Sequence, residues 1–284
     1  MRLVSYTRDG TAAAGILLGE EIVPLSALER PPAANVRGVL EELDIDGLRE
    51  LGELGAAGGE RLGLEDVALD APVVDPQKIV CIGLNYRDHA EEAGQEIPAA
   101  PMWFAKFANS LRGSGAEVVL PAAHPEYVDY EAELALVIGR RARNVSERDA
   151  LAHIAGVMPF NDVSARDLQL QNPLWTSGKA IDSFAPCGPA LVTLDEAGDL
   201  GGLTLRARID GETLQEGSTA NLIFGPAELV SWLSRTMTLL PGDIIATGTP
   251  AGVGASQGRF LRPGNTIEIE IDGLGRLSNP VRSE

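Results

Sequence analysis

The hydrophobic pattern of the chain changes near residue 75. Before it, the short apolar runs LVSY, AAAGILL and EIVPL are typical of strands, and the stretch VRGVLEELDIDGLRELGELG has a weak helical period. The prolines of the following segment, DAPVVDPQ, break helices and strand pairing, as in a linker. Longer apolar runs then alternate with Gly, Pro and Asp-Gly turns. We predict a mixed α/β, mostly β protein with a small α+β N-terminal domain (residues 1–74) and a larger domain (residues 75–284).

Two Asp-Gly pairs mark hairpins in the larger domain. RARIDGETL and IEIEIDGLGRL each place Asp-Gly between strand-like runs, which is a strong local signal for a tight hairpin. In the second segment Glu268 and Glu270 alternate with isoleucines, as in a strand with one face in water. We expect these two glutamates to lie at the surface.

A second Glu-x-Glu pair occurs in a different setting. Glu131 and Glu133, in YVDYEAELALVIG, share one face of a strand but lead directly into LALVI, which is apolar on both faces. Buried carboxylates this close together must take up protons unless a cation neutralises them. Mg²⁺, Mn²⁺ or Ca²⁺ would suit such oxygen ligands, whereas no Cys/His spacing indicates Zn²⁺.

Asp162 is the candidate third ligand. It ends the apolar run IAGVMPF and precedes SARDLQLQ, where a helix is predicted to begin with Ser164 and Asp167 as a capping pair. The alternative is that Asp162 only caps this helix. Spacing alone leaves both interpretations open.

Charge narrows the class of partner. The chain has 41 acidic and 23 basic residues, for a formal net charge of −18. This excess would repel the phosphates of nucleic acids and an anionic membrane surface, so neither is an expected partner. If the substrate is an anion, the site must supply positive charge from a metal, a lysine or an arginine.

Cysteine usage and the N-terminus indicate the cytoplasm. Cys81 and Cys187 lie in apolar runs, KIVCIGL and FAPCGPAL, which predicts two buried free thiols and a reducing compartment. The N-terminus MRLVSYTRDG lacks a positive-then-apolar signal pattern. No segment approaches the roughly 20 apolar residues of a membrane span. We therefore expect a cytoplasmic protein.

Five ordered motifs give the chain a family resemblance. CIGLNYRDHAEE, DYEAELALVIG, FNDVSARDLQ, SGKAIDSFAPCGP and LLPGDIIATGTPAGVG resemble the fumarylacetoacetate hydrolase family, from Lys78 nearly to the C-terminus. The resemblance implies a β-roll fold, a homodimer and a small anionic oxo-acid substrate. It also implies that Glu131, Glu133 and Asp162 bind Mg²⁺ or Mn²⁺.

The resemblance also suggests roles for other residues. It places His89 and Glu92 on a short mobile helix over the substrate; their spacing of three independently puts them on one helix face, although a surface pair would share it. Lys179 matches the family's active-site lysine, and Gln169 could donate a hydrogen bond to a developing oxyanion. The positions expected to contact or support the substrate site are Arg166, Lys106, Gly248, Thr249 and Asp182. Gly248 and Thr249 lie in a Gly-rich turn whose N–H groups could surround a carboxylate, but which lacks the Walker lysine and the Rossmann spacing expected of a nucleotide site.

The resulting hypothesis is hydrolysis of a carbon–carbon bond in an acylpyruvate or another 2,4-dioxo acid. His89, oriented by Glu92, would activate water, while Lys179 and Gln169 would stabilise the oxyanion. Isomerisation of hydroxymuconate-type diacids and decarboxylation of oxaloacetate-type acids are alternatives with the same site. A non-catalytic binding module with structural Ca²⁺ is an alternative of another class; it would explain the carboxylates but not His89, Glu92 and Lys179.

Overall fold

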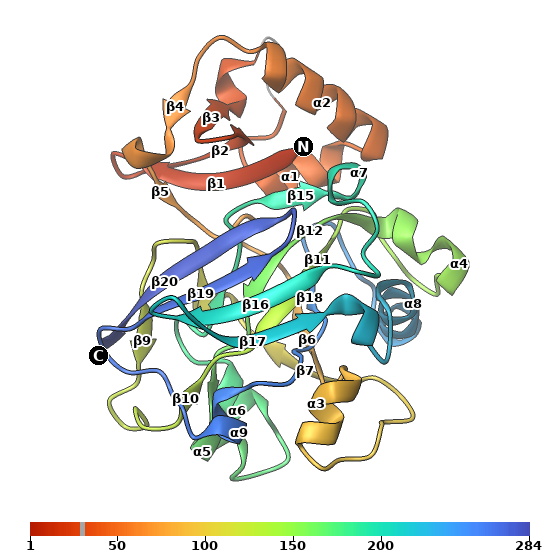
Figure 1. Cartoon of the computed structure of the whole chain (residues 1–284). Helices are drawn as coiled ribbons and strands as arrows, with labels where there is room; N and C mark the ends of the chain where they lie inside the picture. Colours follow the sequence, from red (N-terminus) through yellow and green to blue (C-terminus); the bar gives the residue numbers. More distant parts are fainter. Residues whose placement is uncertain (29–31) are drawn as a thin grey trace.

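Most strands belong to one of two sheets (Figure 1). The computed structural model describes residues 1–28 and 32–284. Across the eleven-stranded sheet the order is β4 (Leu62–Gly63), β3 (Glu21–Pro24), β2 (Thr11–Leu18), β1 (Arg2–Arg8), β15 (Leu191–Thr193), β12 (Ile154–Asn161), β11 (Ala132–Ile138), β18 (Ile244–Ala246), β6 (Ile79–Gly83) and β7 (Met102–Lys106), and β5 (Ala68–Leu69) pairs with β1. The five-stranded sheet has the order β17 (Glu212–Ser218), β16 (Thr204–Ile209), β19 (Thr266–Ile271), β20 (Gly275–Ser283) and β9 (Val118–Leu120). The predicted mixed, mostly β fold is confirmed.

Short strand pairs and helices surround the sheets. The pairs are β10 (Val128–Asp129) with β13 (Ser164–Ala165), and β14 (Ala185–Pro186) with β8 (Leu111–Arg112). The α-helices are α1 (Val36–Glu42), α2 (Ile45–Ala57), α3 (Arg87–Glu92), α4 (Glu147–Ala150), α5 (Arg166–Gln169), α6 (Thr176–Lys179), α7 (Leu194–Ala197), α8 (Pro226–Thr236) and α9 (Gly254–Gln257). The 3₁₀ helices are Leu25–Ala27, Leu64–Asp66, Ala108–Ser110, Leu151–His153 and Thr219–Asn221. None of the described helices is long and apolar enough to cross a membrane.

The N-terminal strands continue the larger sheet. β1 pairs antiparallel with β15 through Arg2 opposite Val192 and Leu3 opposite Leu191. The predicted helical stretch forms α1 and α2, each started by a side chain that accepts a backbone N–H. These elements lie at the end of the molecule opposite α3, α5, α6 and α9 (Figure 1). The division into domains at residue 74 stays a prediction.

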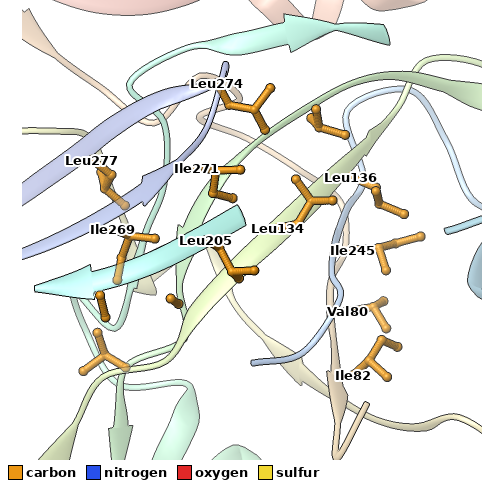
Figure 2. Close-up of a cluster of buried hydrophobic side chains, with 14 of the residues drawn as sticks. Val80, Ile82, Leu134, Leu136, Leu205, Ile245, Ile269, Ile271, Leu274 and Leu277 are labelled. Atoms are coloured by element: carbon orange, nitrogen blue, oxygen red, sulfur yellow. The ribbon is translucent and has the colours of Figure 1, made fainter. Parts of the chain in front are cut away.

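The central strand β11 is covered on both faces, as its apolar run predicts. All seven of its residues are buried. Leu134 and Leu136 join a core with the five-stranded sheet, where Leu205 and Ile269 lie on the facing strands (Figure 2). The alternate residues of β11 pack into a second core that includes side chains of the N-terminal strands. Because successive side chains of β11 point to opposite faces of the sheet, this one strand contributes to both cores.

Both predicted hairpins and the two free thiols are confirmed. Asp210 and Gly211 form a two-residue turn between β16 and β17 with φ of 51° and 84°, the positive values that a type I′ turn requires. Three residues, 272–274, join β19 to β20. Cys81 and Cys187 are buried free thiols.

The predicted capping pair of α5 is wrong. The residue that caps α5 is Ala165, which offers no side-chain acceptor. Ser164 belongs to β13, and its hydroxyl donates to the carbonyl of Asp162. The carboxylate of Asp167 instead lies 2.6 Å from Nδ1 of His124. The chain stays extended through Ser164 and Ala165. The helix therefore begins at Arg166, one residue later than a cap at Ser164 would start it.

Candidate active site

Three carboxylates meet where two interior strands of the larger sheet, β11 and β12, begin and end. Glu131 directly precedes β11 and Asp162 directly follows β12. Because these strands are antiparallel, with Ala132 opposite Asn161, the two ends lie side by side. Glu133 is the second residue of β11, and oxygens of the three carboxylates lie within 4.8 Å of one another. All three side chains are buried.

The charge balance at these carboxylates fits a divalent cation. Glu133 accepts a hydrogen bond from the N–H of Gly248 (2.8 Å). Burial, and then the charges of Asp162 and Glu131, raise the pKa of Glu133 well above its usual value. A cation among the three carboxylates would remove this repulsion, and carboxylate oxygens are the ligands that Mg²⁺, Mn²⁺ and Ca²⁺ prefer. The triad can therefore hold such an ion.

Lys179, at the end of α6, places a positive charge against two of these carboxylates. Its Nζ lies 2.8 Å from Oε2 of Glu131 and 2.9 Å from Oδ2 of Asp162. Burial opposes the charged form of Lys179, but these two carboxylates outweigh it and raise the pKa of the ammonium. The same ammonium lies 5.1 Å from the ring centre of Phe104, within cation–π range.

Lys106 lies behind the triad. Its Nζ donates to the carbonyls of Val163 (2.9 Å), Lys179 (2.6 Å) and Phe184 (2.6 Å), which uses all three of its protons. Oδ1 of Asp162, 2.7 Å from Nζ, therefore makes a charge contact without a hydrogen bond. Lys106 was expected to contact substrate, but its side chain is fully buried and neutralises Asp162 from within the protein.

Arg166, at the start of α5, connects the triad to a fourth carboxylate. Its Nη2 lies 2.8 Å from Oε1 of Glu131, and its Nε donates to Oδ2 of Asp129 (2.8 Å). Its Nη1 donates to Oε1 of Gln169 (2.8 Å). Arg166 and Gln169 both line the cavity described below. Asp129 was missed from the sequence, although it lies in the same motif as Glu131.

His89 and Glu92 lie on α3, as predicted, and face the same cavity. Nδ1 of His89 is 3.1 Å from Oε2 of Glu92. The other oxygen of Glu92 accepts hydrogen bonds from the N–H of Gly252 (2.9 Å) and the hydroxyl of Ser256 (2.7 Å). Sequence spacing indicated the first contact but contained no signal for the other two.

In the Gly-rich turn after β18, the Gly248 N–H and the Thr249 hydroxyl both donate hydrogen bonds to other groups of the protein. The N–H of Gly248, expected to bind a substrate carboxylate, donates to Glu133 instead. Thr249 lines the cavity, but its hydroxyl donates to the carbonyl of Ala132 (2.9 Å). Asp182 was expected to support Lys179; it is exposed and accepts a hydrogen bond from Asn109 (2.6 Å).

These groups open onto a cavity of about 330 Å³. Its polar side includes two of the triad carboxylates, Lys179, Arg166 and the pair on α3. Its apolar lining includes Ile82, Leu84, Phe104, Leu170, Trp175 and Val253. The sequence could not identify these apolar residues, because such side chains are ordinary core residues until the fold brings them to one cavity. An anion can bind here with its charged end towards the cations.

The fold and the site together define a class of proteins in which buried carboxylates that can hold a cation share one cavity with a His–Glu pair. Residues 78–282 match the family model described as "Fumarylacetoacetate (FAA) hydrolase C-terminal". The chain belongs to the fumarylacetoacetate hydrolase family.

Several similar proteins cover nearly the whole chain. The mitochondrial oxaloacetate tautomerase of Xenopus laevis is 38% identical over 99% of this chain and 90% of its own length. The 2-hydroxyhepta-2,4-diene-1,7-dioate isomerase of Mycobacterium marinum is 34% identical, with a TM-score of 0.79 over 100% of this chain and 99% of that one. The maleylpyruvate hydrolase of Sphingobium sp. SYK-6, solved with manganese(II) and pyruvate, is 30% identical, with a TM-score of 0.83 over 100% and 99%. These relatives are a tautomerase, an isomerase and a hydrolase.

Proposed function

We propose that this protein interconverts the keto and enol forms of a small 2-oxo diacid of the oxaloacetate type. The observation that carries the proposal is the His89–Glu92 pair, which faces the cavity containing Glu131, Lys179 and Arg166. Tautomerisation needs one group that moves a proton between carbon and oxygen, and this pair can provide it. The name of the Xenopus relative, an oxaloacetate tautomerase, supports the same reaction.

The basic, proton-transferring and acidic residues of the site would each have a separate role. Lys179 and Arg166 would attract the carboxylates of the diacid and orient it in the cavity. His89 would accept a proton from the carbon beside the oxo group and deliver it to the oxo oxygen, which completes the enol; the reverse reaction would return the proton from oxygen to carbon. Glu92 would stabilise the protonated imidazole between the two transfers. Glu131, Glu133 and Asp162 would hold Mg²⁺ or Mn²⁺, which when bound polarises the oxo group and acidifies the neighbouring carbon.

Hydrolysis of a carbon–carbon bond in an acylpyruvate is the second candidate. It is supported by the maleylpyruvate hydrolase relative and by Gln169, which lines the cavity and could donate to an oxyanion. Hydrolysis needs an activated water, whereas tautomerisation needs only the proton transfer that His89 offers. Decarboxylation of oxaloacetate would use the same substrate position. A purely structural Ca²⁺ module would leave the pair on α3 and its cavity without a role.

A direct assay separates these reactions. We would follow decay of the enol absorbance of oxaloacetate with Mn²⁺, and measure pyruvate released from oxaloacetate and from acetylpyruvate in parallel. Wild type should accelerate tautomerisation over the Mn²⁺ blank, while His89→Asn should lose about 100-fold or more of that rate. Glu131→Gln should show a similar loss, because the cation loses a ligand. Pyruvate release from acetylpyruvate without faster tautomerisation would replace the proposal with the hydrolase.

We further propose that the protein is a cytoplasmic homodimer. The buried free thiols suit a reducing compartment. Met102, Trp103 and Phe107 are large, exposed apolar side chains on or just after β7, an edge strand of the larger sheet. A second copy could cover them, since exposed apolar groups of this size often mark an interface. Light scattering coupled to gel filtration would measure the mass directly.

A further inference from the structure

We propose that Ser256 is a positioning residue that holds Glu92 against His89 and keeps α3 over the cavity. The inference rests on the proposed function for its catalytic consequence. Its structural part is the attachment of α3 to Gly252, just before α9, and to Ser256 within α9. This attachment can be measured without any substrate.

The carboxylate of Glu92 is held at both oxygens. Oε2 contacts Nδ1 of His89 at 3.1 Å, while Oε1 accepts from the hydroxyl of Ser256 at 2.7 Å and the N–H of Gly252 at 2.9 Å. The Ser256 hydroxyl has one proton, and the carbonyl of Val253 lies 2.8 Å away as a competing acceptor. A charged acceptor makes the stronger hydrogen bond, so the carboxylate is the favoured partner.

Polar contacts matter at α3 because the helix has little apolar packing. Ala90 is its only buried residue. The start of the helix is tied down by Arg87, whose Nη1 donates to the carbonyl of Leu222 (2.6 Å). At its end, Glu92 connects the helix to Ser256 and Gly252. Loss of the Ser256 contact should therefore loosen the end of the helix that carries the proton-transferring pair.

The loop that receives Glu92 is itself firmly anchored. The fully buried carboxylate of Asp129 accepts the N–H groups of Gly254 (2.7 Å) and Ala255 (2.9 Å). The same carboxylate accepts Nε of Arg166 (2.8 Å). A Cβ at Gly254 would collide with Oδ1 of Asp129 and the carbonyl of residue 259. Asp129 thus fixes Arg166 and the start of α9, which carries Ser256, relative to each other, and both Arg166 and Ser256 line the cavity.

Three substitutions at Ser256 test the proposal. Ser256→Ala removes the donor, Ser256→Thr keeps it, and Ser256→Asp sets a second carboxylate against Glu92. Because Ser256 is exposed, we expect all three variants to fold, and their melting temperatures verify this. With the tautomerase assay, kcat should fall about tenfold in Ser256→Ala, further in Ser256→Asp and little in Ser256→Thr, with a smaller change in KM.

Hydrogen exchange supplies the readout that does not depend on the reaction. The amides of residues 87–93 should exchange faster in Ser256→Ala and fastest in Ser256→Asp, while Ser256→Thr resembles wild type. Ser146→Ala is the matched control, since the Ser146 hydroxyl also donates to an exposed carboxylate, that of Asp149 (2.6 Å), and neither residue lines the cavity. Unchanged exchange of α3 in Ser256→Asp would overturn the proposal. Failure of the assigned reaction alone would show as inactive wild type with this exchange pattern intact.

Discussion

At the scale of single residues, the same spacing has two outcomes in this chain. Glu133 is 1% exposed, and its pKa is raised by burial and by the neighbouring carboxylates. Glu268 belongs to an identical Glu-x-Glu pair, but its side chain remains partly exposed, with Arg276 at 3.4 Å. The surroundings, and not the spacing, decide which pair can bind a cation.

The burial of Glu133 predicts that Glu133→Gln changes thermal stability in opposite directions relative to wild type, without and with bound metal. The folded protein keeps the proton of Glu133 at pH values where the unfolded chain has released it, so this group makes the metal-free protein less stable as pH rises above the usual glutamate pKa. Glu133→Gln should therefore raise the metal-free melting temperature at neutral pH, by about 2 °C or more. Saturating Mn²⁺ should stabilise wild type by about 2.7 kcal/mol at 100 times Kd, but not the variant.

Melting curves at pH 5 and 8, in EDTA and in Mn²⁺, would measure both effects. The gain in melting temperature from Glu133→Gln should be larger at pH 8 than at pH 5. The wild-type protein loses stability progressively as pH rises above the pKa of the unfolded glutamate, and the variant does not. Glu268→Gln is the control and should change neither curve. A Glu133→Gln protein still stabilised by Mn²⁺ would argue against Glu133 as a ligand.

At the scale of elements, the end of β6 shapes the apolar wall of the cavity. The ring of Trp175 packs against Gly83, where a Cβ would collide with it. Trp175 also contacts Phe104 edge to face, with ring centres 5.8 Å apart. A glycine at this position therefore allows the segment before α6 to close against the strand.

Gly83→Ala should push Trp175 out of its place. We expect a stability loss of about 1–3 kcal/mol from overpacking, with a raised KM because the cavity wall moves. Urea unfolding and steady-state kinetics measure the two effects. Gly59→Ala is a suitable control, since a Cβ there meets nothing within 4 Å. Wild-type stability and KM in Gly83→Ala would show that the indole moves without cost.

At the scale of the whole molecule, one core spans the predicted domain boundary. Leu3 and Ile16 of the N-terminal strands are buried in the same cluster as Ala135 and Val137 of β11. The sheet is also continuous through β1 and β15. Residues 1–74 are therefore expected to unfold together with the rest of the chain.

The test uses two probes of one urea transition. All three tryptophans lie after residue 75, so their fluorescence reports the larger part, while far-ultraviolet circular dichroism also includes α1 and α2. The two curves should coincide, and Ile16→Ala should shift both by the same amount, about 2–5 kcal/mol in unfolding free energy. Two separate midpoints, with the tryptophan curve unmoved by Ile16→Ala, would instead show an independent N-terminal domain.

The sequence by itself determined the features that depend on near neighbours in the chain. A run apolar on both faces predicted the buried strand β11, the Asp-Gly pairs predicted two hairpins, and a spacing of three placed His89 beside Glu92. The motif series identified the family and its three carboxylates. The first three inferences succeed because backbone geometry fixes how residues a few positions apart face one another. The family and its three carboxylates follow instead from the resemblance of the motifs.

Only the tertiary structure decided how the charges are matched. Lys106 was expected at the substrate but lies behind Asp162, and Asp129 holds both Arg166 and the start of α9. Glu92 meets Ser256 although 164 positions separate them in the chain. Such contacts depend on how sheets and loops distant in the sequence pack together. This packing decides which opposite charges lie close enough to stabilise a buried charge.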